Sequence, residues 1–386
     1  MKIIYISHWR FPSEKAFSPF AMKTCEGFAD QGMEVELWIP RRRNPRYRNK
    51  DPFAYYGVRK NFIVRRLPVM DFMGVSSGRI GFAFLLATFN VSVALYMLIR
   101  GMGRREVFYF HDIRDALLPF LLARNSFFEI HDFYRTGVGW INRRLLSGAR
   151  GLVVTNQIKI TALRRDFGIP PDRMLHQPNA VDVKRFALLT SKKEARDTLN
   201  LPQDKIIVLY AGHLYGWKGV DTLLAAHQCL NPGIIIYFNG GTDEDIERFR
   251  TKVPKSGAEN VVIAGRRPYG ETPMWMRGAD VLVLPNTARH QASLTDTSPL
   301  KLFEYMASGS PIVASDLPSV RDIVDERMVW FFEPDNPGGL CAAIHACLAD
   351  PEESEKKAAR AREHAENFTW EKRSRAIADF VKKRYD

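Results

Sequence analysis

The chain has 386 residues, enough for two domains that each bury a core of their own. A hydrophobic fraction of 46%, a charged fraction of 26% and 12% aromatic residues are typical of a globular protein and exclude wholesale disorder. The four cysteines are dispersed, and no Cys-x-x-Cys occurs. This pattern argues against disulfides and zinc and predicts a protein of the reducing cytoplasm.

The net charge of +13 is concentrated in the first half of the chain. Residues 1–190 contain 30 Lys and Arg against 15 Asp and Glu, whereas residues 191–386 contain 26 against 28. Residues 41–66 hold ten basic side chains against a single acid, Asp51: Arg41, Arg42, Arg43, Arg46, Arg48, Lys50, Arg59, Lys60, Arg65 and Arg66. Such a segment attracts nucleic acid or anionic lipid headgroups, and a solvated basic loop fits it equally well.

Short apolar runs alternate with amphipathic, helix-length segments along the chain, which predicts βαβ units and parallel sheets. The first ten residues lack the apolar core of a signal peptide and are expected to form the first strand. The strands expected in the first half are residues 3–7, 35–39, 62–67, 107–110, 127–130 and 151–155.

Residues 80–99 lack Asp, Glu, Lys and Arg, and their length is about that of a membrane span. They lie between two expected strands, so a span would separate consecutive strands of one sheet. We therefore favour a buried crossover helix, with a helix lying in the membrane interface as the alternative.

The second half repeats the pattern, with strands expected at residues 206–211, 234–238, 261–263, 281–284, 311–314 and 329–332. We expect an N-terminal, acceptor-binding, Rossmann-like domain over residues 1–186 and a linker over 187–203. A nucleotide-sugar-binding domain over residues 204–366 follows, with a C-terminal helix over 367–386 that packs back on the first domain. The binding and acceptor roles in this division come from the family resemblance described below.

Ligands of open parallel sheets bind at the carboxyl ends of the strands, so the residues that follow each strand are the candidates for a site. Histidines and acids follow several of them: Ser7-His8, His111-Asp112, His131-Asp132 and Gly212-His213.

The segment Asp296-Thr-Ser-Pro-Leu-Lys-Leu-Phe-Glu304-Tyr-Met-Ala-Ser-Gly309 reads as a helix with its first turn at Pro299 and its C-terminal cap at Gly309. Its N-terminus could hold a phosphate, because the first backbone N–H groups of a helix are free and the dipole favours an anion. Glu304, further along the helix, could accept hydrogen bonds from vicinal hydroxyls.

This segment resembles the retaining GT-B glycosyltransferases of family four, whose hallmark is two acids separated by seven residues. Four further segments are similar to motifs of that family and occur in the same order: Gly212-His213-Leu-Tyr-Gly-Trp-Lys218-Gly219-Val-Asp221, Gly278-Ala-Asp280-Val-Leu-Val-Leu-Pro285, Pro178-Asn179-Ala180-Val181-Asp182 and Phe368-Thr-Trp370. The resemblance implies two Rossmann-like, doubly wound α/β domains facing an interdomain cleft.

The resemblance also implies roles for individual residues. Lys218 would bind the diphosphate of a nucleotide sugar, and Glu304 would bind its ribose. Asp296 and His131 would serve the transferred sugar and the reaction. Further donor contacts are expected from Gly212, Arg266, and the backbone of Leu300 and Lys301. His213 stands where the family usually has Arg, which weakens one cationic contact.

The implied reaction is sugar transfer with retention of configuration, without a resident cofactor or a required metal. The implied partners are a nucleotide-sugar donor and a glycan or lipid-linked acceptor. Because the N-terminal domain is basic, we expect a cytoplasmic protein that can contact the anionic inner face of the cell membrane. The family often has a Gly-Gly pair after the first strand, where this chain has Ser7-His8-Trp9. The acceptor therefore stays open, as do the sugar and the base.

Two other classes of function remain as alternatives. A GT-B epimerase or phosphorylase would share the fold, but the acid pair and the loop around Lys218 favour transfer from a nucleotide sugar. A nucleic-acid-binding protein would use the basic segment 41–66, but the sequence contains no aromatic-rich RNA motif or recognition helix.

Overall fold

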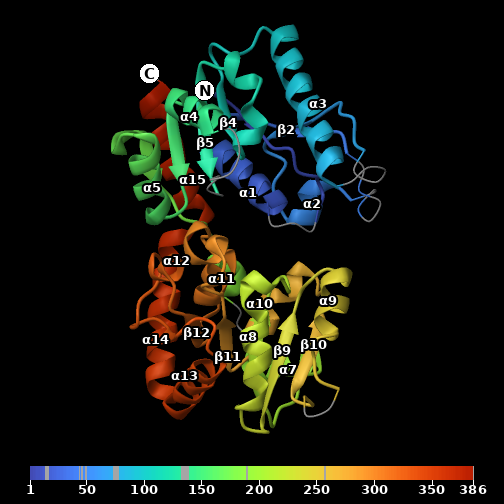
Figure 1. The fold of residues 1–386 in the computed structure, drawn as a ribbon, viewed down its shortest axis with the longest axis vertical. Coiled ribbons are helices and arrows are strands. Elements are labelled where there is room, and N and C mark those ends of the chain that lie inside the picture. The colour runs from blue at the N-terminus through green and yellow to red at the C-terminus, as the bar shows by residue number, and fades with distance from the viewer. Residues whose placement is uncertain are drawn as a thin grey trace. The chain divides into compact units, whose positions relative to one another are not determined.

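The computed structural model describes residues 1–13, 17–42, 44, 47, 50–72, 78–131, 139–187, 190–255 and 258–385. They form two compact units (Figure 1). Unit 1 comprises Met1–Pro178 and Trp370–Asp386, and unit 2 comprises Asn179–Thr369. Asp132 and three arginines of the basic segment (Arg43, Arg46 and Arg48) lie outside the described residues.

Unit 1 is built on a parallel, seven-stranded sheet of order β3-β2-β1-β4-β5-β6-β7. Six of its strands lie where the apolar runs predict them, and the seventh, β7, is an addition to the prediction. The strands are β1 (Lys2–Ile6), β2 (Glu34–Pro40), β3 (Ile63–Leu67), β4 (Val107–Phe110), β5 (Asn125–Ile130), β6 (Gly151–Val154) and β7 (Met174–His176).

Helices cover this sheet and bury its apolar side chains in two clusters. The helices of unit 1 are α1 (Phe17–Asp30), α2 (Pro52–Tyr56), α3 (Gly78–Ile99), α4 (Gly139–Gly148), α5 (Gln157–Phe167) and α15 (Trp370–Tyr385). Two short 3₁₀ helices, η2 (Ile113–Ala116) and η3 (Pro119–Leu121), follow β4 and contact α3.

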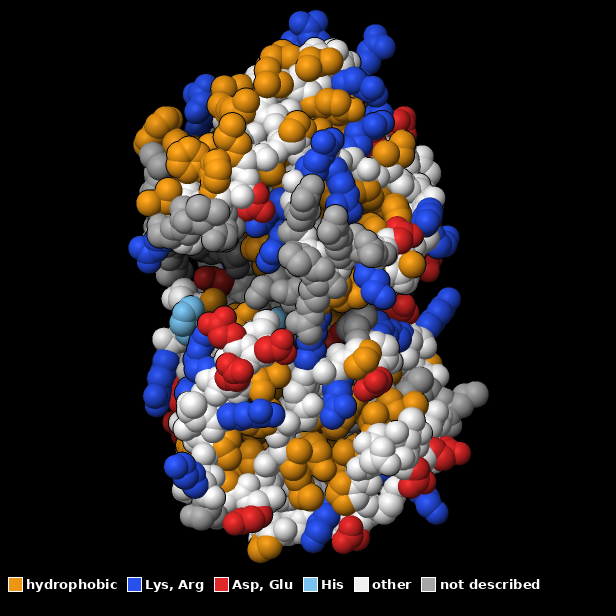
Figure 2. Space-filling view, turned by 90° about the vertical axis from the view of Figure 1, so that its right-hand side faces the viewer, with side chains coloured by type: hydrophobic (Ala, Val, Ile, Leu, Met, Phe, Trp, Pro, Cys, Tyr) orange, Lys and Arg blue, Asp and Glu red, His pale blue; other side chains and the backbone are white. Residues whose placement is uncertain are grey.

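Helix α3 is the predicted crossover between β3 and β4, but only one of its faces is buried. Leu85, Phe89, Val93 and Met97 pack into the core of unit 1. The opposite face exposes apolar side chains, and Figure 2 shows hydrophobic groups gathered in this region beside Lys and Arg. Among the described residues, α3 is the one helix long and apolar enough to span a membrane.

Unit 2 contains a parallel, six-stranded sheet of order β10-β9-β8-β11-β12-β13. Its strands are β8 (Ile206–Ala211), β9 (Ile234–Asn239), β10 (Val261–Gly265), β11 (Val281–Leu284), β12 (Ile312–Ser315) and β13 (Trp330–Phe332). Its helices are α6 (Val183–Phe186), α7 (Lys192–Leu199), α8 (Val220–Ala225), α9 (Asp243–Arg250), α10 (Thr272–Gly278), α11 (Leu300–Ser308), α12 (Pro318–Arg321), α13 (Pro337–Ala349) and α14 (Pro351–Ala365). The predicted α/β class with two parallel-sheet domains is confirmed.

The segment expected to be a linker, residues 187–203, contains α7 and belongs to unit 2. A capping box between Ser191 and Glu194 starts the helix, and Arg196 donates a 2.9 Å hydrogen bond to the carbonyl oxygen of Gly278. The division between the units therefore falls at Pro178, before the expected linker. The sequence does not predict this packing, because the Lys-rich residues of α7 are typical of an exposed linker.

The C-terminal helix α15 lies in unit 1, against α1. Ile377, Ala378 and Val381 of α15 enter the core, and Arg373 forms a fully buried ion pair with Glu129 of β5. The Arg373 Nε also donates a 3.1 Å hydrogen bond to the carbonyl oxygen of Pro178. This helix is thus an integral part of the unit that the first 178 residues build.

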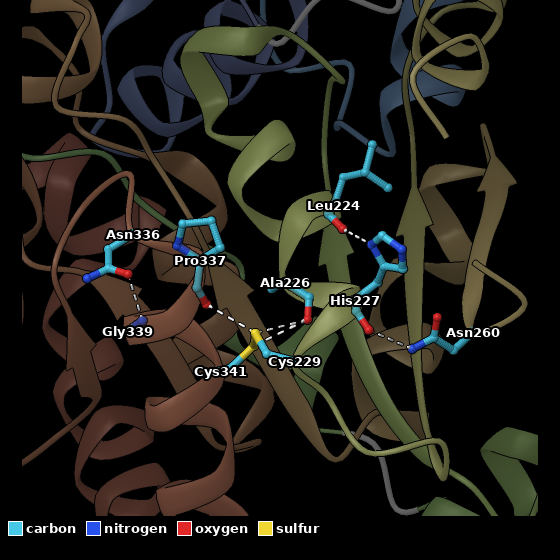
Figure 3. Close-up of a disulfide and its surroundings, with 9 residues drawn as sticks. All are labelled: Leu224, Ala226, His227, Cys229, Asn260, Asn336, Pro337, Gly339 and Cys341. Atoms are coloured by element: carbon cyan, nitrogen blue, oxygen red, sulfur yellow. Dashed lines mark hydrogen bonds between the residues drawn. A yellow bond between two sulfur atoms is a disulfide. The ribbon is translucent and has the colours of Figure 1, made fainter. Parts of the chain in front are cut away.

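The expectation of free cysteines is wrong for one pair. Cys229 and Cys341 form a disulfide in unit 2 (Figure 3). Cys25 and Cys347 are free. The pairing joins the segment after the 3₁₀ helix η6 (Ala226–Gln228) to α13 across a sequence separation of 112 residues. Their Cα atoms lie 6.1 Å apart, within the range that a disulfide bridges. Sequence spacing cannot reveal such a pairing because only the fold brings the two cysteines together.

The basic segment 41–66 is partly neutralised by acids of unit 1. Arg42 pairs with Asp71 at 2.8 Å and Lys60 pairs with Asp51 at 2.9 Å. Arg59 pairs with Glu26 and Asp30. Arg65 pairs with Glu36. Arg41 and Arg66 have no carboxylate partner among the described residues, so the free positive charge is smaller than the composition suggests.

Candidate active site

The carboxyl ends of β8, β9 and β10 form a glycine-rich rim in unit 2. Gly212, Gly240 and Gly265 follow or end these strands, and all three have positive φ angles. The N–H of Gly212 donates to the Asn239 carbonyl oxygen, and the N–H of Gly240 donates to that of Gly265, each at 2.8 Å. A Cβ on Gly240 would lie 2.3 Å from the Gly212 carbonyl oxygen, so the backbones meet only because side chains are absent.

Lys218 lies on the loop between β8 and α8, as the sequence predicts for a phosphate ligand. Gly219, which follows it, has a φ of 72° and packs directly against the next strand end. A Cβ there would lie 1.7 Å from the carbonyl oxygen of Pro285, so this position excludes every other residue. The glycine therefore fixes where the lysine emerges, and the Lys218 Nζ lies 3.8 Å from the centre of the Trp217 ring.

Lys301, in the first turn of α11, brings a second ammonium group to the same rim. Its side chain is buried, and its Nζ lies 3.7 Å from the centre of the Tyr210 ring. A Cβ on Gly212 would lie 2.6 Å from this Nζ, so the ammonium rests against the glycine backbone. The sequence motif predicts only a backbone role for Lys301, and the structure adds its charge.

The two ammonium groups are uncompensated. Lys301 Nζ has no hydrogen-bond partner, and neither lysine forms a salt bridge within the part of the chain that the structure describes. Burial lowers the pKa of Lys218 to about 7. Burial, and then the charge of Lys218, lower the pKa of Lys301 well below its usual value, with Glu304 acting in the opposite sense. A bound anion would supply the missing negative charge to both.

Helix α11 starts at Leu300, after Pro299, and ends at Gly309 in the left-handed conformation, as predicted. Leu300 and Lys301 are in the first turn, where backbone N–H groups have no partner within the helix. Asp296 ends a single π-helical turn, Ala292–Asp296, and accepts a 2.9 Å hydrogen bond from the Thr295 hydroxyl. Asp296 and Glu304 are both half-buried, at the start and in the middle of this segment.

The motif around Asn179 holds the loop that precedes α11. The Asn179 amide Nδ2 donates a 2.5 Å hydrogen bond to the Ser298 carbonyl oxygen, and its backbone N–H donates to the Ser298 hydroxyl at 3.3 Å. Two motifs that are far apart in the sequence are thus joined within unit 2. This contact sets the entry into α11, and with it the first-turn N–H groups and Lys301.

His213 and Arg266 occupy the ends of β8 and β10, as expected. The His213 ring stacks on Tyr215 at a centroid distance of 4.9 Å, and its Nδ1 lies 3.6 Å from a carboxylate oxygen of Asp245. Arg266 follows Gly265 and is half-buried. Their predicted contacts with a donor stay predictions.

Two further features of this rim were not predicted from the sequence. Gly240-Gly241 follow β9, and the pair is visible in the sequence as a signal for close backbone approach. Asn286 follows β11 and is fully buried, and neither atom of its amide has a hydrogen-bond partner among the described residues. A buried amide is costly unless hydrogen-bond partners are supplied, which at a strand-end rim a water or a ligand can do.

Unit 1 has a rim of its own, at the ends of β1, β4 and β5. His131 follows β5, and its Nε2 lies 2.9 Å from the Glu129 carboxylate. Burial alone would raise the pKa of Glu129, but Arg373 and His131 outweigh it and hold this pKa well below its usual value. His111 is buried beside His131, and burial, with the nearby His131, lowers its pKa to about 3. His131 is the more exposed of the two, which suits it better for ligand contact.

A second buried pair lies beside these histidines. His8 Nδ1 is 2.7 Å from an Asp115 carboxylate oxygen, and both side chains are essentially inaccessible. Asp112 pairs with Arg114, which opposes the effect of burial and holds the pKa of Asp112 low. A cavity of about 10 Å³, room for roughly one water, lies among His111, His131 and their neighbours. The charges of this rim are therefore largely balanced internally.

Comparison with known proteins identifies relatives of this chain. Residues 205–350 match the family model described as Glycosyl transferases group 1. A D-inositol 3-phosphate glycosyltransferase of Streptomyces bingchenggensis (strain BCW-1) is 27% identical over 250 residues, which cover 61% of this chain and 53% of the relative. The match thus spans about half the length of that relative.

Solved structures match the whole chain. Sucrose-phosphate synthase from Thermosynechococcus elongatus superposes with a TM-score of 0.79 at 20% identity, covering 99% of this chain and 98% of the other. Anabaena Alr3699/HepE in complex with UDP-glucose superposes with a TM-score of 0.75 at 15% identity, covering 99% and 100%. Residues 205–350 are therefore similar to the Glycosyl transferases group 1 family, and the chain has the GT-B fold.

Proposed function

We propose that the chain transfers a hexose from a nucleoside diphosphate sugar to a hydroxyl group of a glycan or lipid-linked acceptor. The observation that carries the proposal is the pair of uncompensated ammonium groups, half-buried Lys218 and buried Lys301, at a glycine-lined rim beside a helix N-terminus. A diphosphate provides the anion that this arrangement lacks, and its backbone-lined surroundings leave room for close approach.

The bond between the sugar's anomeric carbon and the diphosphate breaks, and a bond from that carbon to the acceptor oxygen forms. The acceptor hydroxyl attacks from the face that the diphosphate leaves, and its proton passes to the departing diphosphate. Lys218, Lys301 and the first-turn N–H groups of α11 stabilise the negative charge that develops on the leaving group. Because these groups supply positive charge, we propose that transfer needs no divalent metal, and we expect it to persist in a chelator.

The donor class is tested first. Thermal-shift measurements with UDP, GDP and ADP sugars should show a rise in melting temperature for one nucleotide, because ligands that bind the native state stabilise it. Calorimetry should then show that Lys218→Ala weakens binding of that diphosphate by about ten- to a hundredfold. Unchanged affinity in this variant would remove Lys218 from the site.

Asp296 and Glu304 are proposed to act on different parts of the donor. Glu304→Gln should weaken binding of both the sugar nucleotide and the free diphosphate, since both contain the ribose. Asp296→Asn should spare diphosphate binding and lower kcat and kcat/KM together, as expected for an interaction made in the transition state. Proton NMR of the early product should show the donor's anomeric configuration, and an inverted product would refute retention.

The acceptor is the less constrained half of the proposal. The similar Streptomyces protein is named for D-inositol 3-phosphate, so phosphorylated cyclitols form the second candidate class beside glycans and lipid-linked sugars. His131 is proposed to contact the transferred sugar or to assist the reaction. Product analysis with one representative of each acceptor class separates these candidates.

A further inference from the structure

The outer face of α3 is continuous, apolar and exposed. Phe84 and Leu95 each expose 52% of their surface, Leu98 exposes 60% and Ile99 exposes 80%. Ile80 and Val91 extend the same stripe at helical spacing. The helix has 22 residues and is about 33 Å long, and the stripe runs along most of it. Exposed apolar surfaces of this size mark sites of interaction.

Neighbouring elements widen this face. Phe72 packs edge-on against Phe84 at a centroid distance of 5.9 Å, and Met70, 58% exposed, donates its backbone N–H to the Thr88 hydroxyl of α3. Leu118, just before η3, and Leu121 at the end of η3 are also exposed, and η3 contacts α3. We call this set of exposed side chains the α3 face: Met70, Phe72, Ile80, Phe84, Val91, Leu95, Leu98, Ile99, Leu118 and Leu121.

The other face of α3 ties the helix to unit 1. Its side chains Leu85, Phe89, Val93 and Met97 are inaccessible to solvent and pack into the core of unit 1. The buried Asn90 amide donates to the carbonyl oxygens of Leu86 and Arg114, at 2.9 Å each. Crossing a bilayer would expose this half of the core, so the helix is built to lie along a surface.

Positive charge surrounds the α3 face. Arg79 lies at the start of the helix, Arg100 follows its end, and Arg104 and Arg105 are exposed shortly after. No acidic residue occurs between Ile80 and Ile99. In Figure 2, Lys and Arg side chains lie beside the hydrophobic ones in this region.

A basic groove of about 540 Å³ adjoins the last turns of α3. Tyr96 of α3 lines it together with Arg41, Arg65 and Arg66. Asp51 also lines it, but Lys60 pairs with that carboxylate at 2.9 Å. Arg41 and Arg66, which have no carboxylate partner in the described ranges, give the groove its net charge. A phosphate-bearing headgroup fits a groove of this composition.

We propose that the α3 face docks the chain onto an anionic phospholipid bilayer, with α3 lying parallel to the membrane in its interface and the Arg41–Arg66 groove receiving lipid phosphates. Charge complementarity selects this occupant over a second copy of the chain. Pairing two α3 faces in either direction would bring basic ends together, which is repulsive. The proposal does not depend on the donor site of unit 2.

The test uses cosedimentation of the full chain with vesicles of phosphatidylglycerol and phosphatidylcholine, or of phosphatidylcholine alone. We expect binding to the anionic vesicles that weakens with salt, and little binding to the neutral ones. Leu95→Gln/Leu98→Gln should weaken binding at least tenfold, because both side chains would insert in the bilayer. Arg41→Gln/Arg66→Gln should weaken it about 25-fold at low salt, roughly fivefold for each arginine.

Two matched controls accompany these variants. Ala225→Gln/Ala359→Gln changes two exposed helical positions in unit 2, and Arg165→Gln/Arg375→Gln removes two exposed charges from α5 and α15. Both should bind within about threefold of the parent, and unchanged melting temperatures show that all variants are folded. Equal binding to neutral and anionic vesicles, or undiminished binding of Leu95→Gln/Leu98→Gln, overturns the proposal.

Two other results would identify a different occupant of the α3 face. Extraction that requires detergent after a high-salt wash would establish a membrane span. Concentration-dependent dimers that Leu95→Gln/Leu98→Gln dissolves, without vesicle binding by the parent, would establish self-association. Either outcome refutes interfacial docking while leaving nucleotide binding by unit 2 untouched.

Discussion

The strand-end rims of the two units differ in whether their charged side chains are paired with opposite charges. In unit 1, Glu129 is shared between Arg373 and His131, and His8 is paired with Asp115, so the buried charges are balanced. In unit 2, half-buried Lys218 and buried Lys301 are close enough for their charges to interact, and neither forms a salt bridge with a carboxylate among the described residues. A balanced rim is complete without a ligand, whereas the unbalanced rim gains stability from an anion. This difference supports the proposal that unit 2 binds the anionic donor.

The largest effect is expected from unbalancing unit 1. Glu129→Gln leaves Arg373 buried without its counter-ion, which should lower the free energy of unfolding by about 3–5 kcal/mol. Urea denaturation measures the loss, and hydrogen exchange should show it in α15. Glu34→Gln, which breaks an exposed pair with Lys2, should cost less than about 1 kcal/mol. Similar losses in both variants would show that the buried pair has no special weight.

Removing a positive charge from unit 2 should raise the stability of the protein and lower its affinity for the diphosphate. Lys301→Met keeps the length of the side chain and removes an unpaired buried ammonium, so the melting temperature should rise by a few degrees. Diphosphate affinity should fall by about a hundredfold, roughly 2.7 kcal/mol. Lys356→Met, at an exposed position, is the control and should change neither quantity. A Lys301→Met protein that is less stable would contradict the description of this rim as uncompensated.

The same imbalance predicts a pH dependence of donor binding. With its pKa lowered to about 7, Lys218 is mostly neutral at pH 8 in the free protein, and a bound diphosphate restores its proton. Affinity should therefore be greatest below pH 7 and fall up to tenfold for each pH unit above it. Calorimetry in buffers of different ionisation enthalpy should detect proton uptake at pH 8. In Lys218→Ala the pH dependence should be flatter.

The smallest effect concerns His111 in unit 1. Its pKa of about 3 lies below the usual 6.5, so the folded protein keeps this ring neutral while the unfolded chain protonates it. Acidification from pH 6.5 toward 3 should therefore progressively reduce the stability contributed by this group. NMR of the imidazole carbons should show no titration of His111 between pH 8 and 5, and a midpoint near 6.5 would refute this burial effect.

The sheets and the donor segment could be read from the sequence for a clear physical reason. Parallel strands are buried on both faces, so they appear as uninterrupted apolar runs, and α11 carries its own start and stop signals at Pro299 and Gly309. Strand β7 was missed because it has only three residues, between Pro171 and Pro178. Apolar runs and helix caps depend on residues that are close in the sequence, so they can be recognised without the fold.

Contacts between residues that are far apart in the sequence could not be predicted in this way. The charge balance of unit 1 depends on Arg373 meeting Glu129 across 244 residues, and the ion pairs that neutralise Arg42 and Lys60 depend on the packing of loops. We predicted that α3 is buried, but one of its faces is exposed. An apolar run indicates that a helix can be buried, but it does not show how many faces of the helix other elements cover. Lys301 was assigned through its backbone because its ammonium meets Gly212 only in the fold.

The disulfide between Cys229 and Cys341 encloses a particular stretch of chain. Residues 230–340, between the two cysteines, include β9 to β13 and helices α9 to α12, and therefore Asn286, Asp296, Lys301 and Glu304. A single proteolytic cut anywhere in this loop, for example after Lys255, would leave the two fragments covalently joined. Most of the proposed donor site thus lies on a closed ring of polypeptide, which a nicked chain would retain until a reductant opened it.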